Sequence, residues 1–136
     1  MSECLFCRIL DGEIPSRRVY EDDTCIGFLD INPLHRGHTL LIPRRHVADG
    51  TCDAESWEDI ALGIVAVSAL VKEKLGASAV NILSNAGADS GQEVFHFHVH
   101  VIPRFPDHPG MAGLMHRTLG LANELDDVHA LLTSQG

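Results

Sequence analysis

Three histidines recur at every second position in the segment His96-Phe97-His98-Val99-His100-Val101-Ile102. An apolar residue separates each from the next, and this period of two is typical of a β-strand with all three imidazoles on one face. Histidine has an ordinary pKa near neutrality, so it can act as base, acid, nucleophile or metal ligand without extreme tuning. A run of surface histidines is the alternative, but the apolar residues between them favour a strand with one buried face. We therefore predict a functional site on the histidine face.

A loop rich in small residues, Asn85-Ala86-Gly87-Ala88-Asp89-Ser90-Gly91-Gln92-Glu93, comes directly before the histidines. Glycines let backbone N–H groups approach an anion closely, and a concave set of such donors can hold phosphate without a net positive charge. Loops of this composition are more often simple turns. Because this loop leads directly into His96, we expect it to form one wall of the site that contains the histidines.

The positioning elements must come from one chain of 136 residues and 14.8 kDa, which fits a single domain over 1–136. A formal net charge of -9 argues against binding to long nucleic acids, but a nucleotide pocket remains compatible with it. The sequence has no run long and apolar enough for a membrane span and no basic start typical of a secretory signal, so we expect a cytoplasmic protein that does not bind membranes. Cys4, Cys7, Cys25 and Cys52 are too few and too unevenly spaced for a disulfide scaffold.

Hydrophobic periodicity and turn residues predict five strands, three before and two after one long helix in the sequence. Gly76 is a plausible stop for that helix, and a further helix is expected near the carboxyl end. The order of these elements indicates an α+β fold with a largely antiparallel sheet. The predicted strands are 17–20, 25–29, 37–43, 80–84 and 95–102, and the predicted helices are 54–75 and 119–132.

Four further motifs accompany the histidines of 96–102. They are Cys4-Leu5-Phe6-Cys7-Arg8-Ile9, Phe28-Leu29-Asp30-Ile31-Asn32-Pro33, Gly37-His38-Thr39-Leu40-Leu41-Ile42-Pro43-Arg44-Arg45-His46, and Asn85 through Gln92. Together these motifs resemble the histidine triad (HIT) family, whose pattern is His-x-His-x-His-x-x with apolar x. The resemblance covers residues 4–104 and is strongest for the histidine triad nucleotide-binding branch, in particular its bacterial zinc-containing members. It implies a HIT-like fold, with 105–136 as a carboxy-terminal extension. His108, His116 and His129 in that extension are expected to be solvated.

The resemblance implies nucleotidyl transfer to a histidine, with His98 as the nucleophile. A neutral imidazole attacks phosphorus through one nitrogen when the other donates its proton to a fixed acceptor. His100 and His38 resemble the supporting histidines of the family, which bind phosphoryl oxygens or protonate the leaving group. Without the resemblance, His38 is more simply an ordinary histidine at a strand end.

The resemblance also assigns contacts for the rest of a purine nucleotide. Asp30 is similar to the acidic residue that accepts hydrogen bonds from the ribose, although it could instead cap the turn that follows. Glu93 stands where related proteins commonly carry Ser or Thr, and because a carboxylate repels phosphate, only its backbone N–H is expected to contribute. The remaining expected contacts are Leu5, Phe6, Ile9, Phe28 and Ile31 around the base, and Asn85, Gly91 and Gln92 at the phosphate or leaving group.

Cys4 and Cys7, with His46 and His96, match a zinc site in related bacterial proteins. Two thiolates and two imidazoles complete a tetrahedral Zn²⁺ shell, and a site with four protein ligands is structural. A redox cysteine pair and two reduced core cysteines are the competing interpretations. Cys25 and Cys52 are expected to be packing residues.

The leading hypothesis is a phosphoramidase-type hydrolase that releases a nucleoside monophosphate. Alternatives are a dinucleoside polyphosphate hydrolase, a nucleotide-binding or scaffold protein with vestigial activity, and a metal sensor. Family members are typically homodimers, and Ile64, Val67 and Val71 of the long helix are candidates for that surface.

Overall fold

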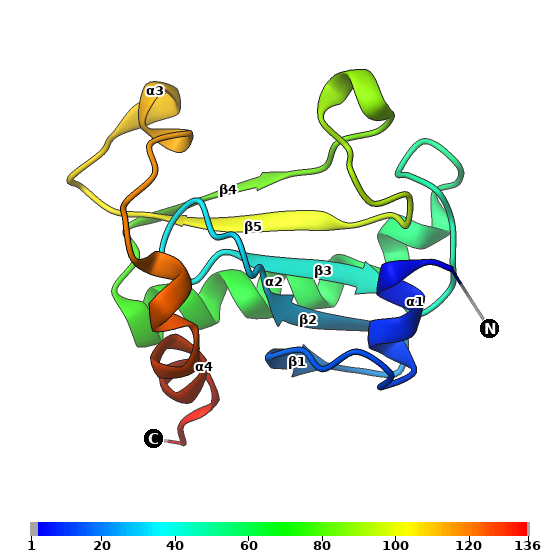
Figure 1. The fold of residues 1–136 in the computed structure, drawn as a ribbon, viewed down its shortest axis with the longest axis horizontal. Coiled ribbons are helices and arrows are strands. Elements are labelled where there is room, and N and C mark those ends of the chain that lie inside the picture. Colours follow the sequence, from blue (N-terminus) through cyan, green and yellow to red (C-terminus); the bar gives the residue numbers. More distant parts are fainter. Residues whose placement is uncertain (1–2, 136) are drawn as a thin grey trace.

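Five antiparallel strands form one sheet in the computed structural model, which describes residues 3–135. The strand order is β1-β2-β3-β5-β4, so the strand that carries the last triad histidine is internal (Figure 1). This confirms the predicted α+β class and the antiparallel sheet. The strands are β1 (Arg18–Glu21), β2 (Cys25–Leu29), β3 (Thr39–Pro43), β4 (Ala79–Leu83) and β5 (Val99–Arg104); the helices are α1 (Leu5–Leu10), α2 (Glu55–Leu75), α3 (Gly110–Leu114) and α4 (Leu125–Thr133), with 3-10 turns η1 (Ala88–Ser90) and η2 (Leu121–Glu124).

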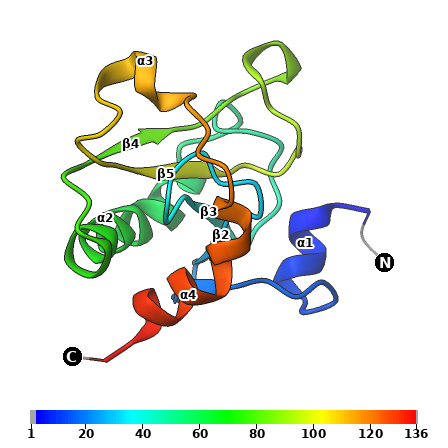
Figure 2. The same ribbon diagram turned by 60° about the vertical axis from the view of Figure 1, so that its left-hand side comes forward.

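Alternating side chains on the central strands divide the interior into two apolar clusters. Leu41 and Val99 face α2 in one cluster, whereas Leu40 and Ile42 pack with α1 in the other. Figure 2 shows the strands between these two helices. His100 pairs with Leu40 across β5 and β3, so the side chain of this histidine lies on the α1 face.

The strand predicted over 95–102 begins only at Val99, so the first two triad histidines precede it. The backbone N–H of Phe97 donates to the carbonyl of Val47 at 2.7 Å, and this partner lies outside the sheet. The side chains of 96–98 therefore alternate as in a strand, although the backbone of these residues lies outside the hydrogen-bonded sheet.

Helix α2 agrees with the predicted helix to within one residue, and the left-handed backbone of Gly76, with φ 73°, ends it. None of the helices in residues 3–135 has the length and apolar character needed to cross a bilayer.

The dimer surface expected on α2 is wrong for Val67 and Val71, which are completely buried in the core of the same chain. Ile64 is partly buried and packs against that core. Leu62 and Val65 are the most exposed large apolar side chains of this helix, with 75% and 70% of their surface accessible.

The carboxy-terminal helix begins later than its predicted start in 119–132. Gly120 has a left-handed backbone, φ 89°, and the 3-10 turn η2 separates it from α4. Leu125, Val128 and Leu132 of α4 are buried in the cluster beneath α2. Helix α4, which lies beyond the region of family resemblance, is thus part of the core.

Expectations for several single side chains are also corrected. Cys25 is buried as expected, but Cys52 is exposed and does not pack in the core. His129 donates from Nε2 to a backbone carbonyl of β1 at 2.9 Å, and the rings of His108 and His116 stack with centroids 3.7 Å apart. His129 thus has a partner within the protein and His108 is half-buried, which corrects the expectation that both are solvated, whereas His116 is exposed as expected.

Candidate active site and metal site

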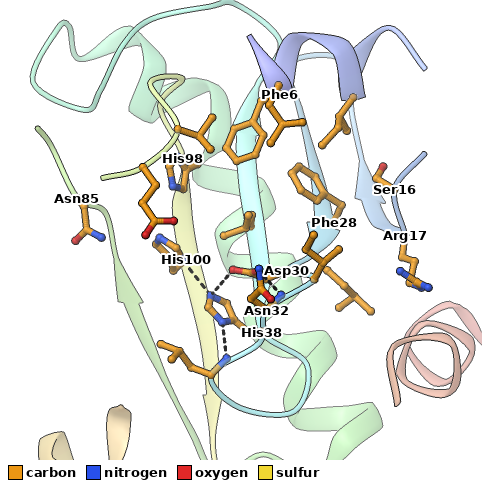
Figure 3. Close-up of a pocket in the computed structure, with 18 of the residues that line it drawn as sticks. Phe6, Ser16, Arg17, Phe28, Asp30, Asn32, His38, Asn85, His98 and His100 are labelled. Carbon is orange, nitrogen blue, oxygen red and sulfur yellow. Dashed lines mark hydrogen bonds and ion pairs between the residues drawn. The ribbon is translucent and has the colours of Figure 1, made fainter. Parts of the chain in front are cut away.

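A cavity of about 460 Å³ opens on the α1 face of the sheet, within the range of about 300–1,000 Å³ common for small-molecule sites (Figure 3). Its α1 end is apolar: the rings of Phe6 and Phe28 meet edge to face at 5.5 Å. His98 lies beside Phe6, whereas His38 and the carboxylate of Asp30 lie further from α1. The expected site residues that line the cavity are Leu5, Phe6, Ile9, Phe28, Asp30, Ile31, His38, Asn85, Gly91, Glu93, His98 and His100.

His98 is fixed in one orientation by its own segment. Its Nδ1 lies 2.8 Å from the carbonyl oxygen of His96, and because a carbonyl can only accept, Nδ1 carries the proton. Burial lowers the pKa of His98, which favours the neutral ring. The edge-to-face contact with Phe6, centroids 5.0 Å apart, packs the ring from the side. Nε2 is therefore the nitrogen with an available lone pair.

A hydrogen-bonded chain fixes the tautomers of the other two cavity histidines. The backbone N–H of Leu34 donates to Nδ1 of His38 at 3.0 Å, so the proton of His38 is on Nε2. This Nε2 lies 2.9 Å from Nδ1 of His100, to which it donates. Burial lowers the pKa of His38 to about 3 and that of His100 to about 4, so both rings are neutral at pH 7. The free nitrogen of His100 is then an N–H donor.

Asp30 lies next to this chain at the end of β2 (Figure 3). One carboxylate oxygen accepts the backbone N–H of Asn32 at 2.8 Å, and the other lies 3.6 Å from Nε2 of His38. Burial raises the pKa of Asp30, partly offset by the bond from Asn32. The carboxylate therefore keeps acceptor capacity on the cavity side.

Gln92 departs from the expectation that it contacts phosphate, because its side chain is directed into the protein. It is 4% exposed and does not line the cavity. Its amide oxygen accepts the N–H of Gly87, and its amide nitrogen donates to the carbonyls of Ala48 and Val94. The side chain thus holds the loop that forms one cavity wall.

Cys4, Cys7, His46 and His96 come together at the amino-terminal end of α1. Nε2 of His96 donates to the carbonyl of Pro43 at 3.0 Å, which leaves a lone pair on Nδ1. That Nδ1 lies 3.2 Å from Nδ1 of His46 and 3.5 Å from the sulfur of each cysteine.

These distances fit a shared metal ion. A tetrahedral Zn²⁺ at about 2.3 Å from sulfur and about 2.1 Å from nitrogen separates sulfur from nitrogen by about 3.6 Å and two nitrogens by about 3.4 Å. Cys7 and His46 also fit, with 3.4 Å between Sγ and Nδ1. The four side chains can therefore hold a divalent metal.

Asp30, His38 and His100 form a second group close enough to share a metal ion, but the positions of the ring protons disfavour metal binding there. A metal on Nε2 of His38 would move the proton of this neutral ring to Nδ1, where it would face the N–H of Leu34. The hydrogen-bonded chain and a bound ion are thus mutually exclusive there.

The cavity also contains side chains that sequence reasoning missed. Met115 and Arg117 reach it from the carboxy-terminal extension, which carries no recognisable motif. His35 anchors this segment, because its Nε2 lies 3.0 Å from the carbonyl of Gly113 and 2.9 Å from that of Leu114. Ser16, Arg17 and Asn32 line the cavity as well.

A model of the HIT domain family matches residues 11–107. An uncharacterized HIT-like protein from Borreliella burgdorferi is 44% identical over 108 residues, which cover 77% of this chain and 78% of that protein. The adenylylsulfatase HINT3 of Arabidopsis thaliana is 38% identical over 111 residues, 76% of this chain and 53% of that protein.

Among solved structures, the fold is similar to that of a Zn-bound histidine triad family protein from Mycobacterium smegmatis. The TM-score is 0.79 and the sequence identity 35%, with 96% of this chain and 93% of that chain covered.

Proposed function

The chain belongs to the HIT domain family, and from this premise we propose that it hydrolyses nucleoside 5′-phosphoramidates or related nucleotide conjugates at the α-phosphate. The single observation that carries the proposal is the bond from Nδ1 of His98 to the carbonyl of His96 at 2.8 Å. It keeps the proton away from Nε2, which makes that nitrogen a nucleophile at the cavity.

In the proposed first step, Nε2 of His98 attacks the α-phosphorus and forms a P–N bond. The bond from phosphorus to the leaving amine breaks, and the amine departs after its nitrogen has gained a proton from solvent; a proton returns to solvent when water attacks in the second step. His100 donates from its free N–H to a phosphoryl oxygen, where negative charge develops. Water then attacks phosphorus, the bond to His98 breaks, and a nucleoside monophosphate is released with His98 neutral again.

The rest of the nucleotide is proposed to follow the cavity from its polar to its apolar end. Asp30 accepts hydrogen bonds from the ribose hydroxyls, because one of its oxygens is available there. The purine lies between the apolar residues near α1, with Phe6 and Phe28 as the largest surfaces. Asn85 and backbone N–H groups of Gly91 and Glu93 contact the phosphate or leaving group.

We also propose a structural Zn²⁺ held by Cys4, Cys7, His46 and His96. Four protein ligands leave no open position, so the metal supplies stability rather than chemistry. Zinc content is measured in protein purified without chelators. One zinc per chain is expected in the wild type and loss of it in Cys4→Ser; a wild type without bound metal contradicts the proposal.

The experiment for the main proposal compares hydrolysis of adenosine 5′-phosphoramidate, a diadenosine polyphosphate and adenylyl sulfate by wild type, His98→Ala and the control His116→Ala. His116 is exposed and does not line the cavity. Release of AMP and ammonia by wild type and His116→Ala alone is expected, with an adenylylated protein detected by mass spectrometry only when His98 is present. Turnover by His98→Ala would contradict the role of this residue.

The substrate comparison also separates the alternatives. Preference for the dinucleotide would assign the chain to the polyphosphate hydrolases, and preference for adenylyl sulfate would bring it closer to the activity named for the Arabidopsis relative. Nucleotide binding without any turnover would indicate a binding protein.

A homodimer is proposed through β4, an edge strand, together with α2. Ile82 of β4 is 49% exposed, and Leu62 and Val65 provide apolar surface on the helix. Light scattering at micromolar concentration should give about twice the 14.8 kDa mass of the chain; a monomer mass excludes it.

A further inference from the structure

One wall of the cavity carries an acidic side chain that the proposed reaction does not use. Glu93 lines the cavity at the loop between β4 and β5, and its side chain is exposed. Within residues 3–135, no ion pair neutralises this carboxylate. A carboxylate in a phosphate-binding region opposes anions, so its presence affects which substrates bind.

The position of the loop identifies the part of the substrate that meets it. In Figure 3, Asn85 lies on one side of His98, and the rings of Phe6 and Phe28 lie on the other. Gly91 is adjacent to Asn85, since a Cβ on that glycine would be 3.6 Å from Nδ2 of Asn85. If the base occupies the aromatic end, the loop is left for the phosphate and the leaving group.

The fixed charges of the cavity are unevenly distributed. Arg17 pairs with Asp126 of α4 at 2.8 Å and lies across the cavity from Asn85 (Figure 3). The charge of Arg117 acts on Asp30, where it offsets part of the rise in pKa that burial causes. Among the residues that the structure describes, the carboxylate of Glu93 therefore has no cationic side chain paired with it at the loop end of the cavity.

We propose that Glu93 is a specificity-determining residue that selects phosphoramidates whose leaving amine carries an additional ammonium group, as in a diamine or a lysine-like amine. The inference rests on the proposed function. The additional ammonium group is not part of the bond that breaks and stays charged during the reaction. The P–N bond to the other nitrogen of the leaving amine breaks, and that nitrogen takes up a proton. The carboxylate of Glu93 pairs with the ammonium group.

The test uses three AMP phosphoramidates whose leaving amines are similar in size and carry a positive, a neutral or a negative group: N-(2-aminoethyl), N-(2-hydroxyethyl) and N-(carboxymethyl). In the wild type, kcat/KM should fall in this order, by about 1.5- to fivefold per step as for an exposed ion pair. Glu93→Gln keeps the shape and should make the three values nearly equal. The readout is the ratio between substrates, so a general change in rate does not affect it.

Asp89→Asn is the matched control, because it removes a carboxylate from the same loop outside the cavity. It should keep the wild-type order, and added salt should reduce the ratios in wild type and control alike. Equal values for the three substrates in the wild type, or an unchanged order in Glu93→Gln, would overturn the inference. Failure of all three substrates to react would instead overturn the proposed phosphoramidase function.

Discussion

Replacing Gln92 by leucine tests whether this side chain supports the loop or contacts the substrate. The amide oxygen accepts the N–H of Gly87 at 2.8 Å, and the amide nitrogen donates to Ala48 at 2.7 Å and to Val94 at 3.0 Å. Leucine has no group that can form these bonds. The substitution therefore leaves three backbone groups of a buried site without their partners.

The size of the effect follows from these three bonds. A hydrogen bond within a protein contributes about 1 kcal/mol net, so the free energy of unfolding should fall by about 3 kcal/mol. An unfolding entropy of about 2.1 cal/mol/K per residue gives about 0.29 kcal/mol/K for 136 residues. The melting temperature should then decrease by about 10 °C.

Thermal unfolding and kcat/KM are measured on the same preparations of wild type, Gln92→Leu and Gln92→Glu. The glutamate variant keeps an oxygen near Gly87 but turns a second oxygen toward two carbonyls, so it should be the less stable of the two. If the melting temperature of Gln92→Leu stays within about 2 °C of wild type while kcat/KM falls by more than about tenfold, the side chain contacts substrate and the reasoning is refuted.

Three further predictions concern stability. Burial lowers the pKa of His38 to about 3 and that of His100 to about 4, so on acidification the unfolded chain binds protons before the folded chain does. The free energy of unfolding should therefore be highest above pH 6.5 and decline toward pH 4. Denaturant midpoints that stay constant over this window would contradict the prediction. Chelation and Cys7→Ser should each lower the melting temperature, and chelation should cause no additional decrease in Cys7→Ser; independent, additive shifts would exclude a shared metal. Gly63→Ala should destabilise by about 1 kcal/mol, because a Cβ would lie 2.8 Å from Cδ1 of Leu41 and the cost of overpacking exceeds the gain in helix propensity; a higher denaturant midpoint would show that the core can adapt.

The alternation of residues in the triad segment was sufficient to predict which side chains face the sheet core and which face the cavity. Phe97 and Val99 are completely buried in the α2 cluster, and His98 and His100 line the cavity. The start of the strand could not be predicted, because it depends on a backbone bond from Phe97 to Val47, and the sequence contains no signal for that pairing.

The carboxy-terminal extension shows a different reason for failure. Its apolar residues predicted a helix, but its route past the cavity depends on distant contacts, such as those of His35 with the carbonyls of Gly113 and Leu114. A lone arginine in an irregular segment has no periodicity and no motif. Arg117 could therefore be identified as a cavity residue only from the tertiary structure.

Two neighbouring histidines of the triad acquire different chemistry from their carbonyl partners. The carbonyl of Pro43 accepts a hydrogen bond from Nε2 of His96 and leaves Nδ1 available for a metal, whereas the carbonyl of His96 accepts a hydrogen bond from Nδ1 of His98 and leaves Nε2 available for the proposed attack on phosphorus. Because His96 is both a candidate metal ligand and the acceptor for His98, its backbone position fixes the orientation of the proposed nucleophile. A metal that holds the ring of His96 would also limit the movement of that carbonyl, so the two proposed sites are coupled through one residue.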